Sequence, residues 1–433
     1  MTTATAAEGR HASWLELFFD LVIVAAVAQL AHLLHDGTGP LELFQVGALY
    51  FAIWSIWTQF TLYANVEGEQ TRRRPMLVAM FGIAVMAAAV PKVAHGDATV
   101  FIVAYVVCRT LANTSWSRTG KILTVWPAAQ AGAGLVPWIV SIWVDAPGRY
   151  WLWALGIALD IVAPVLMAGN PAGLLAQVNE RYRRVEERNA ERAARSPQRQ
   201  AAYEQRVQRK AERQSERDAR RRRAMTVPTE ASLDWSHFNE RLGLFVIIVL
   251  GEAVVQVVGA AAEVPWTDHL WWVVLAGFGL LVCFWWQTLN ADASIPEHDL
   301  LPPRVTLPAH YAMTAGIIGV AAGLGATAEH TDHLSTAVRW VLCGGAALYF
   351  AVRAVLGLLG GASRRWLLGW ALPAVVVPMV LGLAGGHLAS WTVVGVLLAT
   401  AGWQVLYPRL TGTGEDGADA EPGVPKAADQ GDE

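Results

Sequence analysis

Residues 14–30 read WLELFFDLVIVAAVAQL, an apolar run of helix length with two acids, Glu16 and Asp20, in its first turns. The two acids are four residues apart, so they lie on one face of the predicted helix. A carboxylate inside a bilayer is stable only where it is paired, hydrated or neutral. The stretch therefore indicates a membrane helix whose acids have specific partners.

The whole chain has the composition of a membrane protein. Of its 433 residues, 54% are hydrophobic and 16% are charged, and the mean hydropathy is +0.34. Soluble domains carry roughly 25% charged residues. The lipid bilayer is therefore the expected partner of most of the surface. Residues 1–13 contain no apolar core of a cleavable signal, so we expect them to stay in the cytoplasm.

Apolar runs of about 20 residues, the length that crosses a bilayer, recur along the chain. We therefore expect an all-α integral membrane protein with about twelve transmembrane helices. The fifth run contains Pro137 and the eleventh contains Pro373 and Pro378, which a packed bundle tolerates. The predicted spans are 14–34, 42–63, 76–94, 98–117, 122–143, 150–169, 240–262, 268–289, 308–328, 335–358, 365–385 and 389–407.

Basic residues in the short loops orient these spans, because Lys and Arg are enriched on the cytoplasmic side. They fall on alternate loops, which predicts a multi-pass protein with both termini in the cytoplasm. The residues on the basic side include Arg10, Arg72, Arg73, Arg74, Arg118, Lys121, Arg304, Arg364, Arg365 and Arg409.

Landmarks recur in the two halves of the chain in the same order. Tyr105 with Arg109 and Tyr349 with Arg353 form Tyr-x-x-x-Arg pairs in the fourth and tenth spans. We therefore predict two six-helix repeats of the same orientation. The predicted division is a cytoplasmic N-terminal segment 1–13, a first membrane repeat 14–173, a basic cytoplasmic linker 174–239, a second membrane repeat 240–407 and an acidic disordered tail 408–433.

The linker concentrates positive charge. Residues 180–223 contain 16 Lys and Arg against 8 Asp and Glu. The first interpretation is a solvated cytoplasmic linker that sets topology. The alternative is binding of anionic lipid headgroups through Arg220, Arg221, Arg222 and Arg223. No nucleic-acid partner is expected, because neither aromatic interleaving nor a nucleic-acid motif accompanies the charge.

Ionisable residues inside the predicted spans are the candidate functional residues. A charge at the bilayer centre costs about 2.5–3.5 kcal/mol on insertion scales. Asp20 and Arg109 lie at similar depths and are candidates for pairing, whereas Arg353 would have to reach a shallower Glu240 or Glu252.

Two interpretations of these charges remain open. Buried ion pairs that hold helices together are expected for Glu16, Asp20, Glu240 and Arg241. A substrate or proton path is the hypothesis for Glu252, Asp160, Arg109, Arg353 and Gln256. It is best supported for Glu252 and Asp160, because neither has an obvious Arg at its own depth.

No enzyme signature is present in the sequence. It contains no Walker loop, no dinucleotide fingerprint and no Gly-x-Ser-x-Gly motif. His330 and His333 have the spacing of a weak metal site without further ligands, so an exposed polar loop is expected there. We therefore predict no enzymatic activity, no metal and no cofactor.

Two stretches resemble the signatures of a known family. ELFFDLVIVAAVAQLAH at 16–32 and ERLGLFVIIVLGEAVVQV at 240–257 are similar to those of the bacterial low temperature requirement protein A family. The resemblance covers about residues 11–405 apart from the linker. It implies a polytopic inner-membrane protein and no settled reaction, substrate or cofactor. The matching positions are Glu16, Phe18, Phe19, Asp20, Glu240, Arg241, Gly251 and Glu252.

We expect a secondary permease for a small molecule or ion. The alternative is a non-transporting membrane protein that supports envelope function or sensing at low temperature. A water-accessible cavity reached by Glu252, Asp160 or Arg109 would favour transport, and a dry, fully paired core would favour the alternative.

Overall fold

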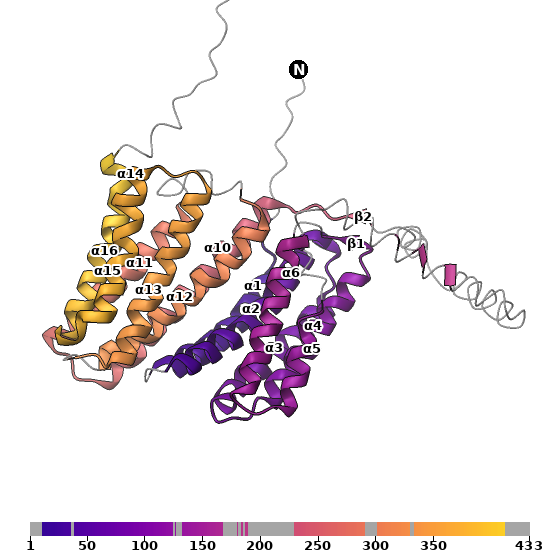
Figure 1. Cartoon of the computed structure of the whole chain (residues 1–433), viewed down its shortest axis with the longest axis horizontal. Coiled ribbons are helices and arrows are strands. Elements are labelled where there is room, and N and C mark those ends of the chain that lie inside the picture. The colour runs from indigo at the N-terminus through magenta and orange to yellow at the C-terminus, as the bar shows by residue number, and fades with distance from the viewer. Residues whose placement is uncertain are drawn as a thin grey trace, which may run out of the picture.

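The computed structural model is a bundle of long helices (Figure 1). Helices α1 (Trp14–His35) and α10 (Trp235–Glu263) begin at the end of the bundle where α16 (Ser390–Thr411) ends. We call this the β end, because two short strands pair there, and the opposite end the His35 end. The structure describes residues 11–35, 39–123, 126, 132–167, 180, 183–184, 187–188, 229–290, 301–329 and 333–411.

Local sequence signals set several helix boundaries. The side chains of Asp234, Thr267 and Ser335 accept hydrogen bonds from the first turns of α10, α11 and α13. The remaining elements of the first half are α2 (Pro40–Glu67), η1 (Gly68–Gln70), α3 (Arg73–Ala94), α4 (Thr99–Ser117), β1 (Lys121–Ile122), α5 (Leu135–Val140), η3 (Ser141–Trp143) and α6 (Gly148–Met167). Those of the second half are β2 (Thr229–Glu230), α11 (Asp268–Leu289), α12 (Pro303–Glu329), α13 (Thr336–Leu359), α14 (Arg364–Trp366), η6 (Leu367–Ala371), α15 (Leu372–Ala384) and η7 (Gly385–His387).

Nine stretches among the described residues are helical, long and apolar enough to cross a membrane. They correspond to nine of the predicted spans: 14–34, 42–63, 76–94 and the six spans after the linker. Helices α4 and α6, of 19 and 20 residues, match the spans predicted at 98–117 and 150–169 but are not among the nine. The chain is thus an all-α polytopic membrane protein.

The span predicted at 122–143 differs from the expectation of one long helix. Its described residues form a regular α-helix only over Leu135–Val140, followed by the 3-10 turn η3. Pro137 lies in the first turn of α5, where its missing N–H removes no helical hydrogen bond. Gly134 precedes this turn and lies directly against Asp160 of α6.

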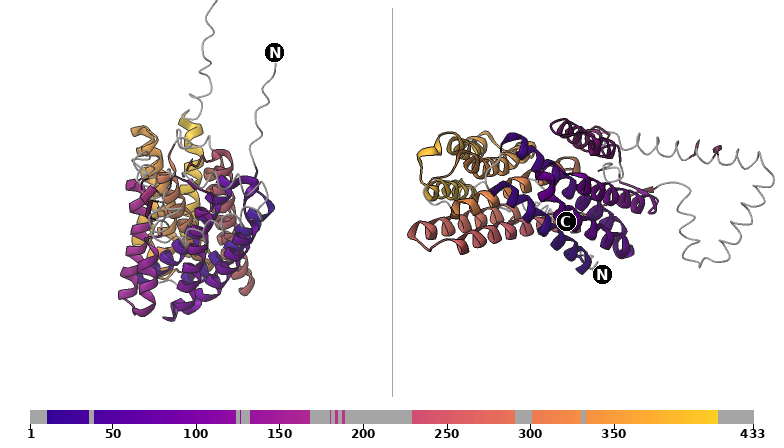
Figure 2. Two further views of the ribbon diagram at one scale, coloured as in Figure 1. Left: turned by 90° about the vertical axis from the view of Figure 1, so that its right-hand side faces the viewer. Right: turned by 90° about the horizontal axis from the view of Figure 1, so that it is seen from below.

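Helix α12 lies at the centre of the bundle and contacts helices of both halves. The first-half and second-half helices lie side by side around it (Figure 2). A Cβ on Gly345 of α13 would lie 2.6 Å from the carbonyl oxygen of Gly316, so α12 and α13 approach backbone to backbone. Small residues allow this close packing, which drives helix association in a bilayer.

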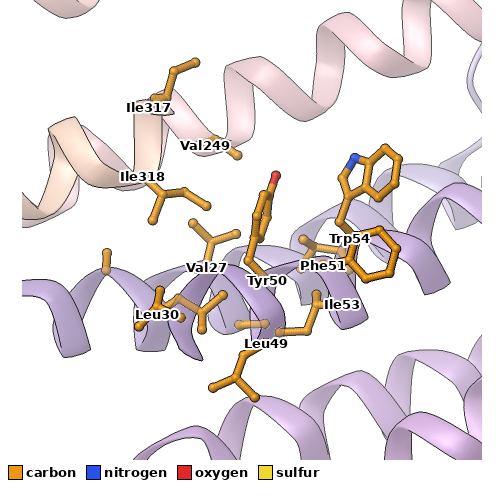
Figure 3. Close-up of a cluster of buried hydrophobic side chains, with 14 of the residues drawn as sticks. Val27, Leu30, Leu49, Tyr50, Phe51, Ile53, Trp54, Val249, Ile317 and Ile318 are labelled. Atoms are coloured by element: carbon orange, nitrogen blue, oxygen red, sulfur yellow. The ribbon is translucent and has the colours of Figure 1, made fainter. Parts of the chain in front are cut away.

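Apolar side chains of four helices fill the junction between the halves (Figure 3). Val27 of α1, Leu49 of α2, Val249 of α10 and Ile317 of α12 are all fully buried there. Other large apolar side chains are exposed, as expected where lipid replaces water. Examples are Phe81, Trp143, Trp151, Trp272 and Leu383.

Pro373, the first proline of the eleventh predicted span, is accommodated by a π-helical segment and a side-chain donor. Pro373 has no N–H, so it cannot donate to the carbonyl of Gly369 one turn earlier. That carbonyl accepts instead from Trp403 Nε1 at 2.8 Å. The π-helical segment η6 contains Gly369 and ends just before α15. The indole therefore replaces the missing backbone donor.

The linker and the tail lie largely outside the described residues, including Arg220, Arg221, Arg222 and Arg223. Of the linker, Glu180 is paired with Arg183 and Arg184 at 2.7 and 3.0 Å. Hydrogen bonds from these guanidinium groups lower the pKa of Glu180. Helix α10 begins at Trp235, five residues before the predicted start, and α16 extends to Thr411, past the predicted end at 407.

Candidate functional site

The two signature stretches meet at the β end of the bundle. Glu16 of α1 lies 3.3 Å from His237 Nε2 of α10, and Asp20 accepts from Arg241 Nη2 at 2.7 Å. Glu16 and Asp20 are four residues apart, as are His237 and Arg241. Because α1 and α10 run in the same direction, the equal spacings put the two contacts in register. All four side chains are buried, and we call them the motif junction.

Asn65 of α2 determines the tautomer of His237. Its Oδ1 accepts the backbone N–H of Asp234 at 3.0 Å, and its Nδ2 donates to the Asp234 carbonyl oxygen at 2.8 Å. The same Nδ2 lies 3.0 Å from His237 Nδ1, so Nδ1 is the acceptor. The remaining ring proton is then on Nε2, which faces Glu16.

A second buried histidine, His310 of α12, lies next to the motif junction. Trp54 Nε1 donates to His310 Nδ1 at 3.1 Å, and His310 Nε2 donates to the Leu242 carbonyl oxygen at 3.2 Å. Trp57 stacks on the imidazole with ring centroids 5.6 Å apart, and its Nε1 donates to Asp20 at 2.8 Å. Two tryptophans of α2 therefore contact His310 of the second half, and one of them also bonds to Asp20.

The structure corrects the predicted partner of Asp20, which is Arg241 rather than Arg109. Depth along the bilayer allowed both pairs, but α4 is not the helix beside Asp20. Arg241 lies on α10, which packs directly against α1. Glu240 is near the surface, with a 3.6 Å contact to His11.

Arg109 of α4 pairs instead with Asp160 of α6, with 2.7 Å between Nη2 and Oδ2. Only 2% and 3% of these side chains are exposed. The expectation that Asp160 has no Arg at its own depth is therefore wrong. A Cβ on Gly134 would lie 2.4 Å from Asp160 Cγ, so only glycine leaves room for the carboxylate at this point of the chain.

The Arg109–Asp160 pair lines a small cavity of about 20 Å³, room for one or two water molecules. The other walls come mainly from α2, whose lining residues follow the spacing of one helix face. Three of these α2 residues are polar and buried: Ser55, Thr58 and Gln59. Within the described part of the chain, Thr58 Oγ1 has no hydrogen-bond partner. The lining residues are Phe51, Trp54, Ser55, Thr58, Gln59, Arg109, Trp126, Asp160 and Ile161.

Glu252 lies on α10 beyond the motif junction, toward the His35 end. Its side chain is 3% exposed and accepts a hydrogen bond from Gln256 Nε2 at 2.7 Å. The i,i+4 spacing of the two residues on one helix explains this contact. The structure therefore brings together Glu252 and Gln256, and separately Arg109 and Asp160.

Arg353 of α13 lies over two aromatic rings. Its guanidinium carbon is 5.8 Å from the ring centre of Tyr349 and 5.9 Å from that of Trp370. The described contacts of Glu240 and Glu252 go to His11 and Gln256, not to Arg353. Arg109 has the same arrangement, 5.9 Å from the ring centre of Tyr105.

The sequence interpretation missed His237, His310, Asn65 and Arg339. Arg339 is buried, and its Nε donates to the Gly382 carbonyl oxygen at 3.1 Å. One signal was available for His237: its spacing to Arg241 equals that of Glu16 to Asp20. The others are recognised only through partners that are distant in sequence.

Among the described residues, no group of three His, Cys, Asp or Glu side chains is placed to hold a metal ion. His330 lies outside these residues, and His333 Nδ1 is 3.3 Å from the Leu388 carbonyl oxygen.

Comparison with known proteins places the chain in a family. A family model described as the bacterial low temperature requirement A protein (LtrA) matches residues 11–401. An uncharacterized protein of Rhizobium meliloti (strain 1021) is 25% identical over 333 residues, 74% of this chain and 69% of the relative. No solved structure matches the chain significantly. The matched range contains both halves of the motif junction, and the chain belongs to the bacterial low temperature requirement A family.

Proposed function

We propose that the chain is a membrane permease for a small polar solute or ion, with its transport site at the cavity beside Arg109 and Asp160. The observation that supports this most directly is a buried ion pair bordering an internal cavity. A purely structural ion pair needs no free space beside it. A transported solute needs both space and polar groups that can replace its water.

The lining of the cavity suits a polar solute. Thr58 and Gln59 contribute a hydroxyl and an amide, and Arg109 and Asp160 contribute opposite charges. Breaking a buried ion pair is strongly unfavourable unless another group compensates the exposed charge. A solute that bonds to Arg109 or Asp160 supplies that compensation, so solute binding and rearrangement of the pair are coupled.

The same proposal includes two six-helix repeats in the bacterial inner membrane, with both termini in the cytoplasm. Arg109 over Tyr105 and Arg353 over Tyr349 support the repeat, because the two pairs have matching spacing and matching ring distances. The basic loops listed above support the orientation. In this arrangement the β end faces the cytoplasm.

The motif junction favours the alternative, a non-transporting protein that acts in the envelope at low temperature. Its Asp20–Arg241 ion pair is fully buried, and the aromatic rings of Trp57 and Phe245 pack beside it 4.3 Å apart. Such a junction holds α1 against α10. The two functions differ in whether water and solutes enter the cavity beside Arg109.

Cysteine accessibility tests the proposal without knowledge of the solute. In the full chain with Cys108, Cys283 and Cys343 replaced by alanine, Thr58→Cys places a thiol in the cavity wall. Thr61→Cys is the matched control, because Thr61 is on the same helix, equally buried and not part of the lining. Vesicles containing each variant are treated with a small charged methanethiosulfonate reagent.

We expect Thr58→Cys to react and Thr61→Cys to stay unmodified. The double variant Arg109→Gln/Asp160→Asn should change the reaction rate of Thr58→Cys, because it removes both charges from the cavity. Equal protection of both thiols would contradict a solute path. Uptake of radiolabelled ions and small solutes by the same vesicles then identifies what is moved.

A further inference from the structure

We propose that Glu252 is a proton-binding site, reached from the His35 end of the bundle through a notch at Gly325. Resting on the permease proposed above, the proton bound here is its coupling ion. The site is separate from the Arg109–Asp160 pair, because it lies on α10, next to α1 and α12.

Glu252 differs from the other buried acids in its surroundings. Glu16 has His237, Asp20 has Arg241 and Asp160 has Arg109 within 3.3 Å. Glu252 has only the neutral amide of Gln256 among the described residues, although its side chain is as buried as theirs.

A buried carboxylate with no cation beside it is stabilised by binding a proton, which removes the charge from the apolar surroundings. Gln256 donates to one oxygen of Glu252 in either state, and the other oxygen is then the one that takes the proton.

Gly325 of α12, which has no side chain, leaves a notch in the surface of that helix where His35 and Gln256 come close together. A Cβ at Gly325 would lie 3.3 Å from His35 Nδ1 and 3.5 Å from Gln256 Cβ, so the three residues meet. No side chain from α12 separates His35 from Gln256 at this point. His35 in turn donates to Glu329 at 2.9 Å, and these two side chains are 14% and 33% exposed. Glu329, His35, Gln256 and Glu252 thus form a chain of contacts in which Glu252 is the most buried member.

Other titratable groups lie at this end of the bundle. They belong to the helices that pack against α10 and to α10 itself. Among the described residues, none of these groups forms an ion pair with Glu252, and His35 pairs with Glu329. The groups are His32 and His35 of α1, Glu42 of α2, Glu263 of α10, Asp268 and His269 of α11, and Glu329 of α12.

Dicyclohexylcarbodiimide tests the proton-binding site, because this apolar reagent reacts with protonated carboxyl groups in apolar surroundings. The full chain in lipid vesicles is treated over a range of pH, digested and analysed by mass spectrometry. We expect modification of Glu252 that increases as pH falls, several-fold above that of Asp20 and Asp160 in the same digest. Glu252→Gln should lose the modified peptide.

The notch is tested by substitutions at Gly325. Gly325→Val fills the notch and crowds both His35 and Gln256, so the modification of Glu252 should respond several-fold more slowly to a jump in pH. Gly325→Ala, whose Cβ makes nearly ordinary contacts, should give a smaller effect and covers the case in which Gly325→Val does not fold. Gly259→Val is the matched control on α10, because a Cβ there meets nothing within 4 Å.

Absence of modified Glu252, or modification equal to that of Asp20 and Asp160, would overturn the proton-binding site. An unchanged response in both Gly325 variants would overturn the notch. Neither measurement involves transport or the cavity at Thr58. Failure here therefore leaves the permease proposal intact, and failure of the Thr58→Cys test leaves the proton-binding site intact.

Discussion

Asp20 and Arg241 are 221 positions apart in the chain and form a fully buried ion pair between α1 and α10. Trp57 of α2 donates a third hydrogen bond to the same carboxylate at 2.8 Å. One acid thus holds three helices, two from the first half and one from the second. The two acids of the first signature stretch therefore have their partners at the second signature stretch: Arg241 lies within it and His237 just before it.

Removal of the charge on Asp20 should destabilise the protein strongly. In Asp20→Asn, Arg241 remains buried without a counter-charge, which costs about 3–5 kcal/mol. The free energy of unfolding in mixed detergent micelles measures this loss. Glu240→Gln, at a surface acid on the same helix as Arg241, should change it by no more than about 0.5 kcal/mol.

The double variant Asp20→Leu/Arg241→Met distinguishes the loss of the ion pair from the cost of leaving Arg241 buried without a counter-charge. Because both charges are gone, this variant should be more stable than Asp20→Asn. If the double variant were the less stable of the two, the buried pair would have to be more favourable than apolar packing at this position.

In the two buried histidines, Nδ1 should be the unprotonated acceptor and Nε2 should carry the proton. Trp54 donates to Nδ1 of His310, and Asn65 donates to Nδ1 of His237, so neither Nδ1 has room for a proton. Solid-state NMR of histidine-labelled protein in lipid bilayers measures the tautomer through the ¹⁵N shifts. His333, which is near the surface, serves as the comparison in the same spectrum. A protonated Nδ1 on His310 would contradict the described hydrogen bond.

Loss of the Asn65 amide should disrupt the start of α10. Asn65→Ala leaves the backbone N–H and carbonyl of Asp234, as well as His237 Nδ1, without their described partner. Each buried polar group left unsatisfied costs about 1–3 kcal/mol. Thermal unfolding in detergent should therefore shift clearly downward. Asn290→Ala is the control, because within the described part of the chain the Asn290 side chain makes a single hydrogen bond, of 3.3 Å, to its own helix.

Adjacent glycines of α13 should respond oppositely to alanine. A Cβ on Gly345 would lie 2.6 Å from the Gly316 carbonyl oxygen and 2.9 Å from Val320 N, so α12 has to move. Gly345→Ala should cost about 1–3 kcal/mol. Gly344 has open space, with its nearest neighbour at 4.0 Å, so Gly344→Ala should gain up to about 1 kcal/mol from helix propensity. Unfolding free energies that match for the two variants would contradict the close packing of α12 and α13.

Helix positions were predictable because their causes are local. Runs of apolar residues, caps such as Asp234 and Thr267, and glycines at chain turns all act within a few residues. The segment at 122–143 was the exception. Its apolar content equals that of a spanning helix, but the described helix there is confined to Leu135–Val140.

The candidate sites were only partly predictable. Gln256 lies one turn from Glu252 on the same helix, so that contact follows from helical periodicity. Asp160 and Arg109 were identified as unusual charges, but their pairing was not foreseen. The distance between them along the chain is 51 residues, and no local rule connects α4 with α6.

The sequence alone determined that the chain is a helical membrane protein with two related signature stretches and a small set of buried charges. Composition and periodicity suffice for this, because each apolar run must satisfy its own backbone inside the bilayer. Only the tertiary structure decided the partners of Asp20, Arg109 and Asp160. Depth in the bilayer limits which charges can meet, but helix neighbours and the rotation of each helix about its axis select the pair.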